Sequence, residues 1–366
     1  MKPLRIFSPN LQLLAEIDDY ESLIITRKWH TYGEITLTIH QDKKHVDKLI
    51  NGNILLPGAD FKSASVIRYR ESDLDTLTVK APFLGSYLAQ RLIVPDDPVS
   101  GNAESVMKTF VDTQAVNPVN PFPDVERDYF LLPFHPTTAM WRKPFREFRN
   151  MRVAPDLGRG LTVTRQGKYQ KLSDELESIS RQSGLGWGVY LDNGLVFEVF
   201  EGNDRTVAGN SPVIFSPEFD NVMQQGFVES QFEQINAVYA SNDLEVVDVG
   251  DSFGAERFEH FVKTDENLED YARREMQEPV FALEAEAIES SFRYRVDWDL
   301  GDLVTIQNKK WNIERTARIT EVEEVYEPSN IRINVTFGES QPTIVEKVKK
   351  KLKRFGGLSW PGKIKL

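Results

Sequence analysis

Alternating apolar and polar residues indicate β-strands near both ends of the chain. In residues 34–40, EITLTIH, the side chains of Ile35, Leu37 and Ile39 fall on one face of a half-buried strand. Further strands are predicted within residues 77–83, 227–241, 291–298 and 331–338. Strand patterns therefore occur in the first ninety residues and again in the last third, which predicts β-rich units at both ends.

Apolar residues at helical spacing predict a few short helices. Leu172, Leu176 and Ile179 form a stripe after a candidate cap at Ser173, and Gly184 is the expected end of that helix. Three more helical stretches are predicted: one with Val46, Leu49 and Ile50 that stops at Asn51-Gly52, one after a cap at Asn102 with Val106, Met107, Phe110 and Val111 on one face, and one over residues 267–279 that Pro279 closes.

The helix that ends at Gly184 and the segment after it form the clearest local unit. Residues 186–200, GWGVYLDNGLVFEVF, consist of two apolar runs around the turn sequence Asp192-Asn193-Gly194. Such a pattern is typical of a β-hairpin. One helix followed by two strands predicts a small α+β module in the middle of the chain.

A proline-rich stretch at residues 117–144 separates this module from the preceding helix. It holds six prolines, which exclude a continuous helix or a central strand. It also holds Phe122, Tyr129, Phe130, Phe134 and Trp141, which is too apolar for a flexible linker. We expect an ordered loop that packs against another domain or subunit.

Length and composition indicate a globular protein of two or three domains. The chain has 366 residues, of which 40% are hydrophobic and 11% aromatic. No window approaches the ~20 apolar residues of a membrane span, so no membrane insertion is expected, and the start MKPLRIFSPN lacks the apolar run of a secretory signal. The chain contains no cysteine. Disulfides, thiolate metal sites and thiol nucleophiles are therefore excluded, and folding in a cytoplasm is the simplest expectation.

The charge is acidic and unevenly distributed. A formal charge of −12 argues against a sequence-specific nucleic-acid binder, whose affinity depends on neutralising phosphates. Residues 342–366 carry eight Lys/Arg against one Glu, a net charge of +7, so the preceding residues carry −19. This basic tail is either a solvated helix with a loose end or a docking segment for an acidic partner or a continuing polypeptide.

Three aspartates, Asp297, Asp299 and Asp302, lie within six positions of the sequence DWDLGD. A metal site, a catalytic cluster and a tight corner between two strands are the alternatives. An EF-hand loop counted from Asp297 would require Gly at its sixth position and Glu at its twelfth, where the chain has Asp302 and Asn308. Asp297 also continues the alternation of residues 291–298, and Gly301 gives the backbone freedom to turn. The pattern favours the corner.

Motifs for hydrolysis and for nucleotide binding are missing from the sequence. There are five histidines, no serine in a G-x-S-x-G elbow and no H-E-x-x-H pair. GRGLTVTRQGK and GLGWG resemble nucleotide-binding loops only superficially, because the glycine spacing and the order of strand and helix differ. A glycosidase pair among the 56 carboxylates is left open by spacing alone. The sequence therefore predicts no catalytic, cofactor-binding or metal-ligating residue and no enzymatic activity.

A set of turn and strand motifs resembles one known family. The motifs are the opening strands at residues 18–39, the EGNDRT element at residues 201–206, the Leu300-Gly301-Asp302 corner, the strand at Arg318–Val322 and the closing Phe337-Gly338. Their order along roughly residues 1–340 is similar to that of the siphophage tail hub proteins, which are related to the N-terminal module of tail-associated lysins and to the baseplate hubs of contractile phages.

This resemblance implies a β-rich α+β fold in which two β-barrel-like hub domains are joined by inserted α+β domains. The implied boundaries are residues 1–95 for the first hub domain, 96–207 for the insert, 208–340 for the second hub domain and 341–366 for the basic C-terminal tail. Residues 243–280 are expected to pack with the insert, which would make the second hub domain discontinuous.

The resemblance also implies a structural role in the virion, at the tip of the tail, after assembly in the bacterial host cytoplasm. Three chains would form a ring under the hexamer of the distal tail protein, next to the tape measure protein. A host-binding or lysin protein would attach through the C-terminal tail. The alternatives to this structural role are a cell-wall polysaccharide hydrolase and a carbohydrate-binding adhesion module.

Overall fold

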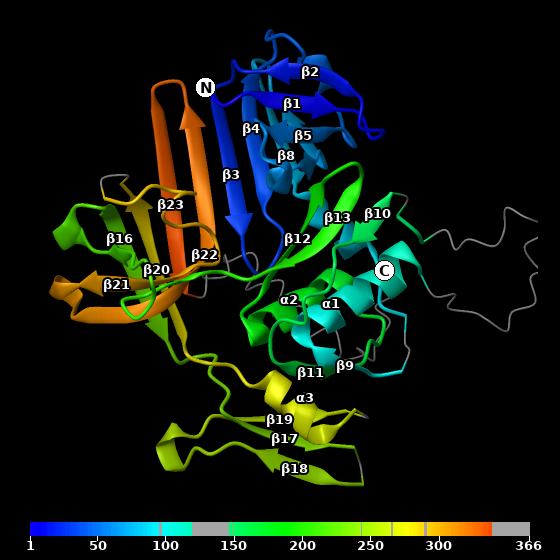
Figure 1. Ribbon diagram of the computed structural model, residues 1–366, viewed down its shortest axis with the longest axis vertical. Coiled ribbons are helices and arrows are strands. Elements are labelled where there is room, and N and C mark those ends of the chain that lie inside the picture. The colour runs from blue at the N-terminus through cyan, green and yellow to red at the C-terminus, as the bar shows by residue number, and fades with distance from the viewer. Residues whose placement is uncertain are drawn as a thin grey trace, which may run out of the picture.

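The computed structural model describes residues 1–94, 97–118, 146–148, 150–242, 244–264, 266–288 and 291–338. Its largest sheet joins the two ends of the chain, because β22 from the last third pairs with β3 from the first (Figure 1). Along its main path the strand order is β16-β20-β23-β22-β3-β4-β8-β7. These strands are β3 (Ser22–Lys28), β4 (Glu34–His40), β7 (Tyr69–Ser72), β8 (Thr76–Pro82), β16 (Val222–Ser230), β20 (Val280–Ala287), β22 (Ile313–Glu327) and β23 (Asn330–Gly338).

The N-terminal core lies between this sheet and a second, four-stranded sheet. The second sheet has the order β2-β1-β5-β6, with β1 (Leu4–Phe7), β2 (Leu13–Ile17), β5 (Ile54–Pro57) and β6 (Ser65–Val66). Ile35, Leu37 and Ile39 of β4 are fully buried between the two sheets. This confirms the strands predicted at residues 34–40 and 77–83.

The helix predicted around Val46 is reduced to a single 3-10 turn, η1 (Val46–Lys48). His45 before it has a left-handed backbone with φ 66°, and Gly52 after it has φ +95°. These two positions leave too few residues for a full α-turn ladder between them.

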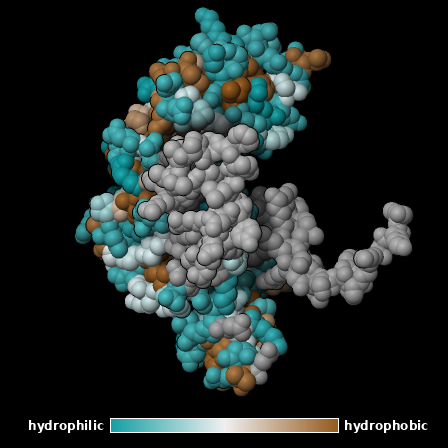
Figure 2. Space-filling model, turned by 90° about the vertical axis from the view of Figure 1, so that its right-hand side faces the viewer, coloured by the Kyte–Doolittle hydropathy of each residue, from teal (hydrophilic) through white to brown (hydrophobic). Residues whose placement is uncertain are grey.

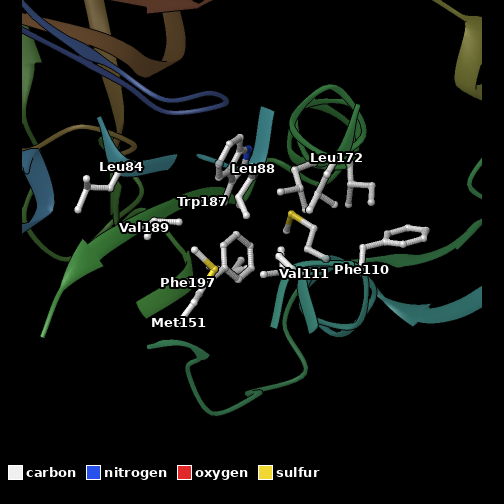
Figure 3. Close-up of a cluster of buried hydrophobic side chains, with 14 of the residues drawn as sticks. Leu84, Leu88, Phe110, Val111, Met151, Leu172, Trp187, Val189 and Phe197 are labelled. Atoms are coloured by element: carbon white, nitrogen blue, oxygen red, sulfur yellow. The ribbon is translucent and has the colours of Figure 1, made fainter. Parts of the chain in front are cut away.

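The middle of the chain packs two helices against a hairpin, as Figure 3 shows for Phe110, Leu172, Trp187 and Phe197. The elements are β9 (Val99–Asn102), α1 (Ala103–Val111), β10 (Met151–Val153), β11 (Thr162–Arg165), α2 (Leu172–Ser183), β12 (Gly186–Leu191) and β13 (Leu195–Phe200). Both predicted helices and the predicted hairpin are confirmed.

The ends of these helices differ in part from the prediction. Ser173 is not the cap of α2, because the preceding Lys171 has the extended backbone of the N-cap position and Ser173 lies inside the helix. Asn102 is the N-cap residue of α1, but its amide donates to the carbonyl of Gly158 instead of capping the helix. Gly184 ends α2 as expected, in the left-handed conformation with φ 73°.

Residues 227–241 form parts of two strands and not one. β16 ends at Ser230, a turn in which the Gln234 N–H donates to the carbonyl of Gln231 follows, and β17 (Ala237–Ser241) starts a separate sheet. That sheet, with the order β18-β17-β19, is covered on one face by α3. It contains β18 (Val246–Val249) and β19 (Glu259–Lys263), and α3 spans Leu268–Glu275. We call β17, β18, β19 and α3 the lower module (Figure 1).

The helix α3 ends four residues before Pro279. Met276 already has an extended backbone, and Gln277 forms a two-way backbone pair with Ile235, with both N–H···O distances 2.9 Å. This pair, and not the proline, draws the chain out of the helix.

Residues 291–298 form a compact turn instead of the predicted strand. Arg295 has φ 62°, and its N–H donates to the carbonyl of Trp298 at 2.7 Å. The rings of Tyr294 and Trp298 lie 4.8 Å apart, while Val296 points to solvent. The alternation of apolar and polar residues was misleading here, because the Tyr294 and Trp298 side chains reach the core from a turn and not from a strand.

The core of the last third surrounds Phe215, Trp298 and Phe337, and the strand predicted at residues 331–338 is confirmed as β23. Two short strands, β14 (Asp204–Arg205) and β15 (Ile214–Phe215), pair in parallel with β21 (Leu303–Asn308). The remaining short helical turns are η2 (Phe61–Ser63), η3 (Leu84–Gln90), η4 (Asp112–Val116), η7 (Pro217–Phe219), η8 (Gly254–Glu256) and η9 (Lys309–Trp311).

Two predictions fall on segments outside the described residues. The five aromatic residues of the proline-rich stretch lie within 119–145, and the basic tail lies within 339–366. Within the described ranges, no helix is both long enough and apolar enough to cross a membrane.

Candidate functional site

The motifs at residues 201–206 and 300–302, about a hundred positions apart, meet at one corner of the fold. Asp302 is buried there, with 2% of its surface exposed. One of its carboxylate oxygens accepts the backbone N–H of Asn203 at 2.8 Å and the side-chain amide of Asn203 at 3.0 Å, and the other accepts the backbone N–H of Asp299 at 3.0 Å. A buried, charged acceptor that binds donors from two segments fixes these segments to each other.

Two glycines allow these segments to approach closely. Gly301 has φ +92°, and a Cβ on it would lie 2.1 Å from the ring of Trp29. A Cβ on Gly202 would lie 1.8 Å from the carbonyl oxygen of Gly301. Neither position has room for a side chain, so the corner requires glycine at both.

Trp29, at the end of β3, lies at the centre of this junction. Its indole N–H donates to the carbonyl of Gly184 at 3.0 Å, and the Arg318 guanidinium stands 5.8 Å from its ring centroid. A Cβ on Gly186 would lie 2.7 Å from the same ring. Trp29 thus contacts the opening strands, the end of α2, the hairpin and the corner. We call Trp29 together with residues 201–203 and 300–302 the corner junction.

The three aspartates of DWDLGD do not converge on a common point. Asp297 accepts the N–H of Arg293 at 2.7 Å, Asp299 pairs with Arg27 at 2.5 Å, and Asp302 holds the corner. Among the described residues, no group of three or more His, Asp or Glu side chains is placed to hold a metal ion. The corner prediction is confirmed for Gly301 and Asp302, whereas Asp297 lies in the turn before it and not in a strand.

A buried charge cluster, centred on Glu324, lies on the core-facing side of β22. Glu324 is 1% exposed; it accepts from Lys2 at 2.8 Å and from the hydroxyls of Tyr326 and Tyr294 at 2.7 and 3.0 Å. Arg295 bridges Glu324 to Asp60. Burial alone would raise the pKa of the Glu324 carboxyl, but Arg295 and Lys2 lower that pKa to about 2.

This cluster joins three distant parts of the chain: the N-terminus, the turn at residues 291–298 and β22. A carboxylate that is buried, ionised and saturated by cations has no proton to give and no free oxygen to accept one. The Glu324 cluster therefore suits a structural link better than acid–base catalysis. Its position was missed from the sequence, although Glu324 shares the core-facing phase of Val322 and Tyr326.

His30 and Ser180 lie in hydrogen-bond contact, at 2.7 Å, and superficially resemble a base and its nucleophile. Ser180 is fully buried and its hydroxyl donates to the carbonyl of Leu185, so the remaining hydrogen bond has His30 Nδ1 as donor. Burial, together with Arg181 and Arg318, lowers the pKa of His30 to about 3. The pair therefore links the β3–β4 loop to α2 and is closed to substrate.

A cleft of about 210 Å³ opens beside the corner junction. Aromatic and charged side chains line it in equal number, and the Lys62 ammonium lies 4.5 Å from the ring centroid of Phe200. The lining, as far as the chain is described, contains no serine, cysteine or histidine, and its Asp299 and Asp302 are already engaged. Among the described residues of the lining, no serine or cysteine nucleophile is therefore paired with a histidine base.

The family model for Siphovirus ReqiPepy6 Gp37-like protein matches residues 3–339. No curated protein sequence matches the chain.

Three similar solved structures are phage tail proteins. The 43 kDa tail protein of prophage MuSo2 from Shewanella oneidensis is 12% identical with a TM-score of 0.55, over 92% of this chain and 98% of its own. A tail protein from Neisseria meningitidis MC58 is 11% identical with a TM-score of 0.55, over 93% and 97%. The prophage tail protein gp18 from Listeria monocytogenes EGD-e is 11% identical with a TM-score of 0.52, over 98% and 100%. At such low identity the likeness concerns the fold alone.

Proposed function

The chain belongs to the Siphovirus ReqiPepy6 Gp37-like protein family, a family of phage tail proteins, and from this premise we propose that it is the structural hub of the tail tip. In this role the protein closes the tail tube and connects the distal tail protein to host-binding or lysin components. It acts by binding other proteins and has no enzymatic activity.

The observation that carries the proposal is the corner junction. Three of the motifs that define the resemblance to tail hubs interlock there through Asp302, Gly301 and Trp29, although they lie up to 270 residues apart in sequence. The contacts form a rigid connection: a buried carboxylate accepts backbone N–H groups, and glycines pack under an indole ring. A tail tip must stay rigid, and a frame of this kind resists separation of its parts.

We further propose the domain division that the resemblance implies. Residues 1–95 and 208–340 are two barrel-like hub domains that share the large sheet, and residues 96–207 are the insert between them. The lower module, within residues 243–280 and the adjoining β17, packs beside the insert, a placement supported by the 3.7 Å ion pair between Lys168 and Glu266. The second hub domain is then discontinuous in sequence.

In the proposed assembly three copies form a ring under the hexamer of the distal tail protein, next to the tape measure protein. Stable interfaces of this kind bury about 1,200–2,000 Å² and expose apolar residues in the isolated chain. Leu13 and Leu14 of the edge strand β2 are exposed on opposite faces of that strand and fit such a contact. The basic tail attaches the host-binding or lysin protein.

Labelling of virions tests the tail-tip position. An affinity tag is placed after Leu74, which is 96% exposed in the turn between β7 and β8, so that the tagged chain folds. Gold-labelled antibody viewed by electron microscopy should mark the distal end of the tail. Label along the tube, at the head junction or absent from virions would overturn the proposal.

A further inference from the structure

The lower module has one covered and one open sheet face. The helix α3 packs on Val238 and Ala240 of β17, which are fully buried. Side chains alternate across a strand, so the intervening Tyr239 faces the other way, together with its cross-strand partners Phe261 and Asp248. We call the sheet surface that carries Tyr239, Phe261 and Val246 the open face.

The open face is accessible, and its apolar side chains lie among the charged side chains of Asp248, Glu259 and Lys263. Phe261 is 55% exposed and Val246 is 62% exposed. The loops at the two ends of β18 add Leu244 and Phe253, of which 95% and 85% are exposed. Figure 2 shows hydrophobic residues gathered at this lower end of the molecule. So many large exposed apolar residues on one small module mark an interaction surface.

The lower module is also the most acidic part of the chain. Residues 231–280 contain 13 Asp/Glu against 4 Lys/Arg, a net charge of −9. On the open face itself, Asp248 and Glu259 are balanced by Arg257, each at 2.7 Å. The exposed carboxylates of Glu245, Asp251 and Glu256 lie in the flanking loops. An occupant of this surface should therefore be apolar at its centre and basic around it.

The C-terminal segment of the same chain has this composition. Residues 342–366 carry a net charge of +7, and Val345, Val348, Leu352 and Phe355 follow one another at intervals of three, four and three. If this segment were helical, the spacing would place the four apolar side chains on one face and the lysines on the remaining faces. An apolar stripe with a basic surround matches an apolar face with an acidic surround.

The segment also leaves the fold beside the module. Gly338 at the end of β23 pairs with Ala282 of β20, and β20 starts at Val280, directly after the module. The 28 residues that follow Gly338 can span roughly 90–100 Å when extended. The segment is therefore long enough to contact the open face.

We propose that residues 342–366 dock on the open face of the lower module of their own chain. Phe261 and Val246 receive the apolar stripe, and the carboxylates of the flanking loops attract the lysines. A protein that binds the tail must then displace it from this face, which couples attachment of that protein to exposure of the module. The docking itself does not depend on the tail-tip role.

Zero-length cross-linking of the full chain tests this inference. A carbodiimide joins lysine amines to carboxylates only where they touch, and mass spectrometry identifies the pairs. We expect links from Lys349, Lys350, Lys351 or Lys353 to Glu245, Asp251 or Glu256, and a strong decrease in 1 M salt, where the Debye length is about 3 Å. Links spread evenly over the acidic surface of the whole chain would overturn the proposal.

A paired substitution separates specific docking from general charge attraction. In the double variant Val246→Asp, Phe261→Asp the same links should fall about tenfold, because the apolar stripe loses its contact and meets added desolvation cost. Leu74→Asp, at the more exposed turn between β7 and β8, is the control and should leave them unchanged. Equal links in the wild type and the double variant would overturn the proposal.

A mixture of isotopically light and heavy chains identifies the chain that supplies the tail. Docking within one chain gives links between residues of the same isotope only. Mixed links in statistical proportion would show that a second copy supplies the tail, and would overturn docking within the chain. Absence of any link between tail lysines and the module would do the same.

Discussion

The three neighbouring aspartates of DWDLGD should differ sharply in their contribution to stability. Asp302 is 2% exposed and accepts hydrogen bonds from three donors, two of them backbone N–H groups. Truncation in Asp302→Ala leaves these donors without an acceptor at a site that solvent reaches poorly. Each buried donor left unsatisfied costs about 1–3 kcal/mol. Because Asn203 is exposed and Asp299 is half-buried, water replaces part of the lost acceptor, and we expect a total loss of about 2–3 kcal/mol in the free energy of unfolding.

Asp297→Ala is the matched control, five positions away in the same sequence. Its side chain is 38% exposed, and it accepts one backbone N–H, from Arg293, in a surface turn. Water can replace that acceptor, so we expect a loss of about 0.5–1 kcal/mol. The two variants remove the same atoms, and only the environment of the carboxylate differs.

Urea denaturation followed by tryptophan fluorescence measures the difference, because Trp29 and Trp298 both lie near the corner. Asp302→Ala should shift the midpoint of unfolding to a clearly lower urea concentration at an unchanged m-value. The reasoning would be refuted by equal midpoints for the two variants, since Asp302 would then not hold the segments together.

Two further predictions concern buried ionisable groups. Burial lowers the pKa of His30 to about 3, so this side chain stays neutral in the folded chain, while in the unfolded chain it binds a proton near its ordinary pKa of 6.5. The free energy of unfolding should therefore fall by roughly 4–5 kcal/mol between pH 7 and 3. His30→Gln should flatten this pH dependence in denaturation curves. A dependence that His30→Gln leaves unchanged would assign it to other groups. Glu324, whose pKa of about 2 keeps it ionised, stabilises the chain above pH 4.5, and this contribution is lost as pH falls towards 2. Glu324→Gln at pH 7 leaves Lys2 and Arg295 without their counter-charge and should cost about 3 kcal/mol, whereas an unchanged midpoint would show that the cluster contributes no net stability.

The elements with regular periodicity could be predicted because their apolar side chains all face the core, as the period indicates. Ile35, Leu37 and Ile39 all lie in the N-terminal core, and Leu172, Leu176 and Ile179 all lie in the core that α2 shares with α1 and the hairpin. The same rule failed at residues 291–298, where one residue with positive φ, Arg295, turns the chain. Alternation alone did not reveal this turn, in which Tyr294 and Trp298 reach the core while Val296 between them is exposed.

The corner junction was partly visible in sequence and partly hidden. Gly301 and Asp302 indicated a turn. Nothing in the local sequence indicated that Gly301 contacts Trp29, 272 positions away, or that Asp302 binds Asn203, 99 positions away. The His30–Ser180 contact, 150 positions apart, likewise left no local signal. Glu324 could have been noticed, because it is a carboxylate in the apolar phase of β22, between Val322 and Tyr326.

The stoichiometry of the complex with the distal tail protein tests the central claim most directly. The full chain is mixed with the hexameric distal tail protein of the same phage, and the mass of the complex is measured by light scattering or mass photometry. The hub account predicts a discrete complex of three chains on one hexamer, whether or not the chain forms a trimer alone. A chain that stays monomeric both alone and with the hexamer, or that binds it in another ratio, would contradict the account.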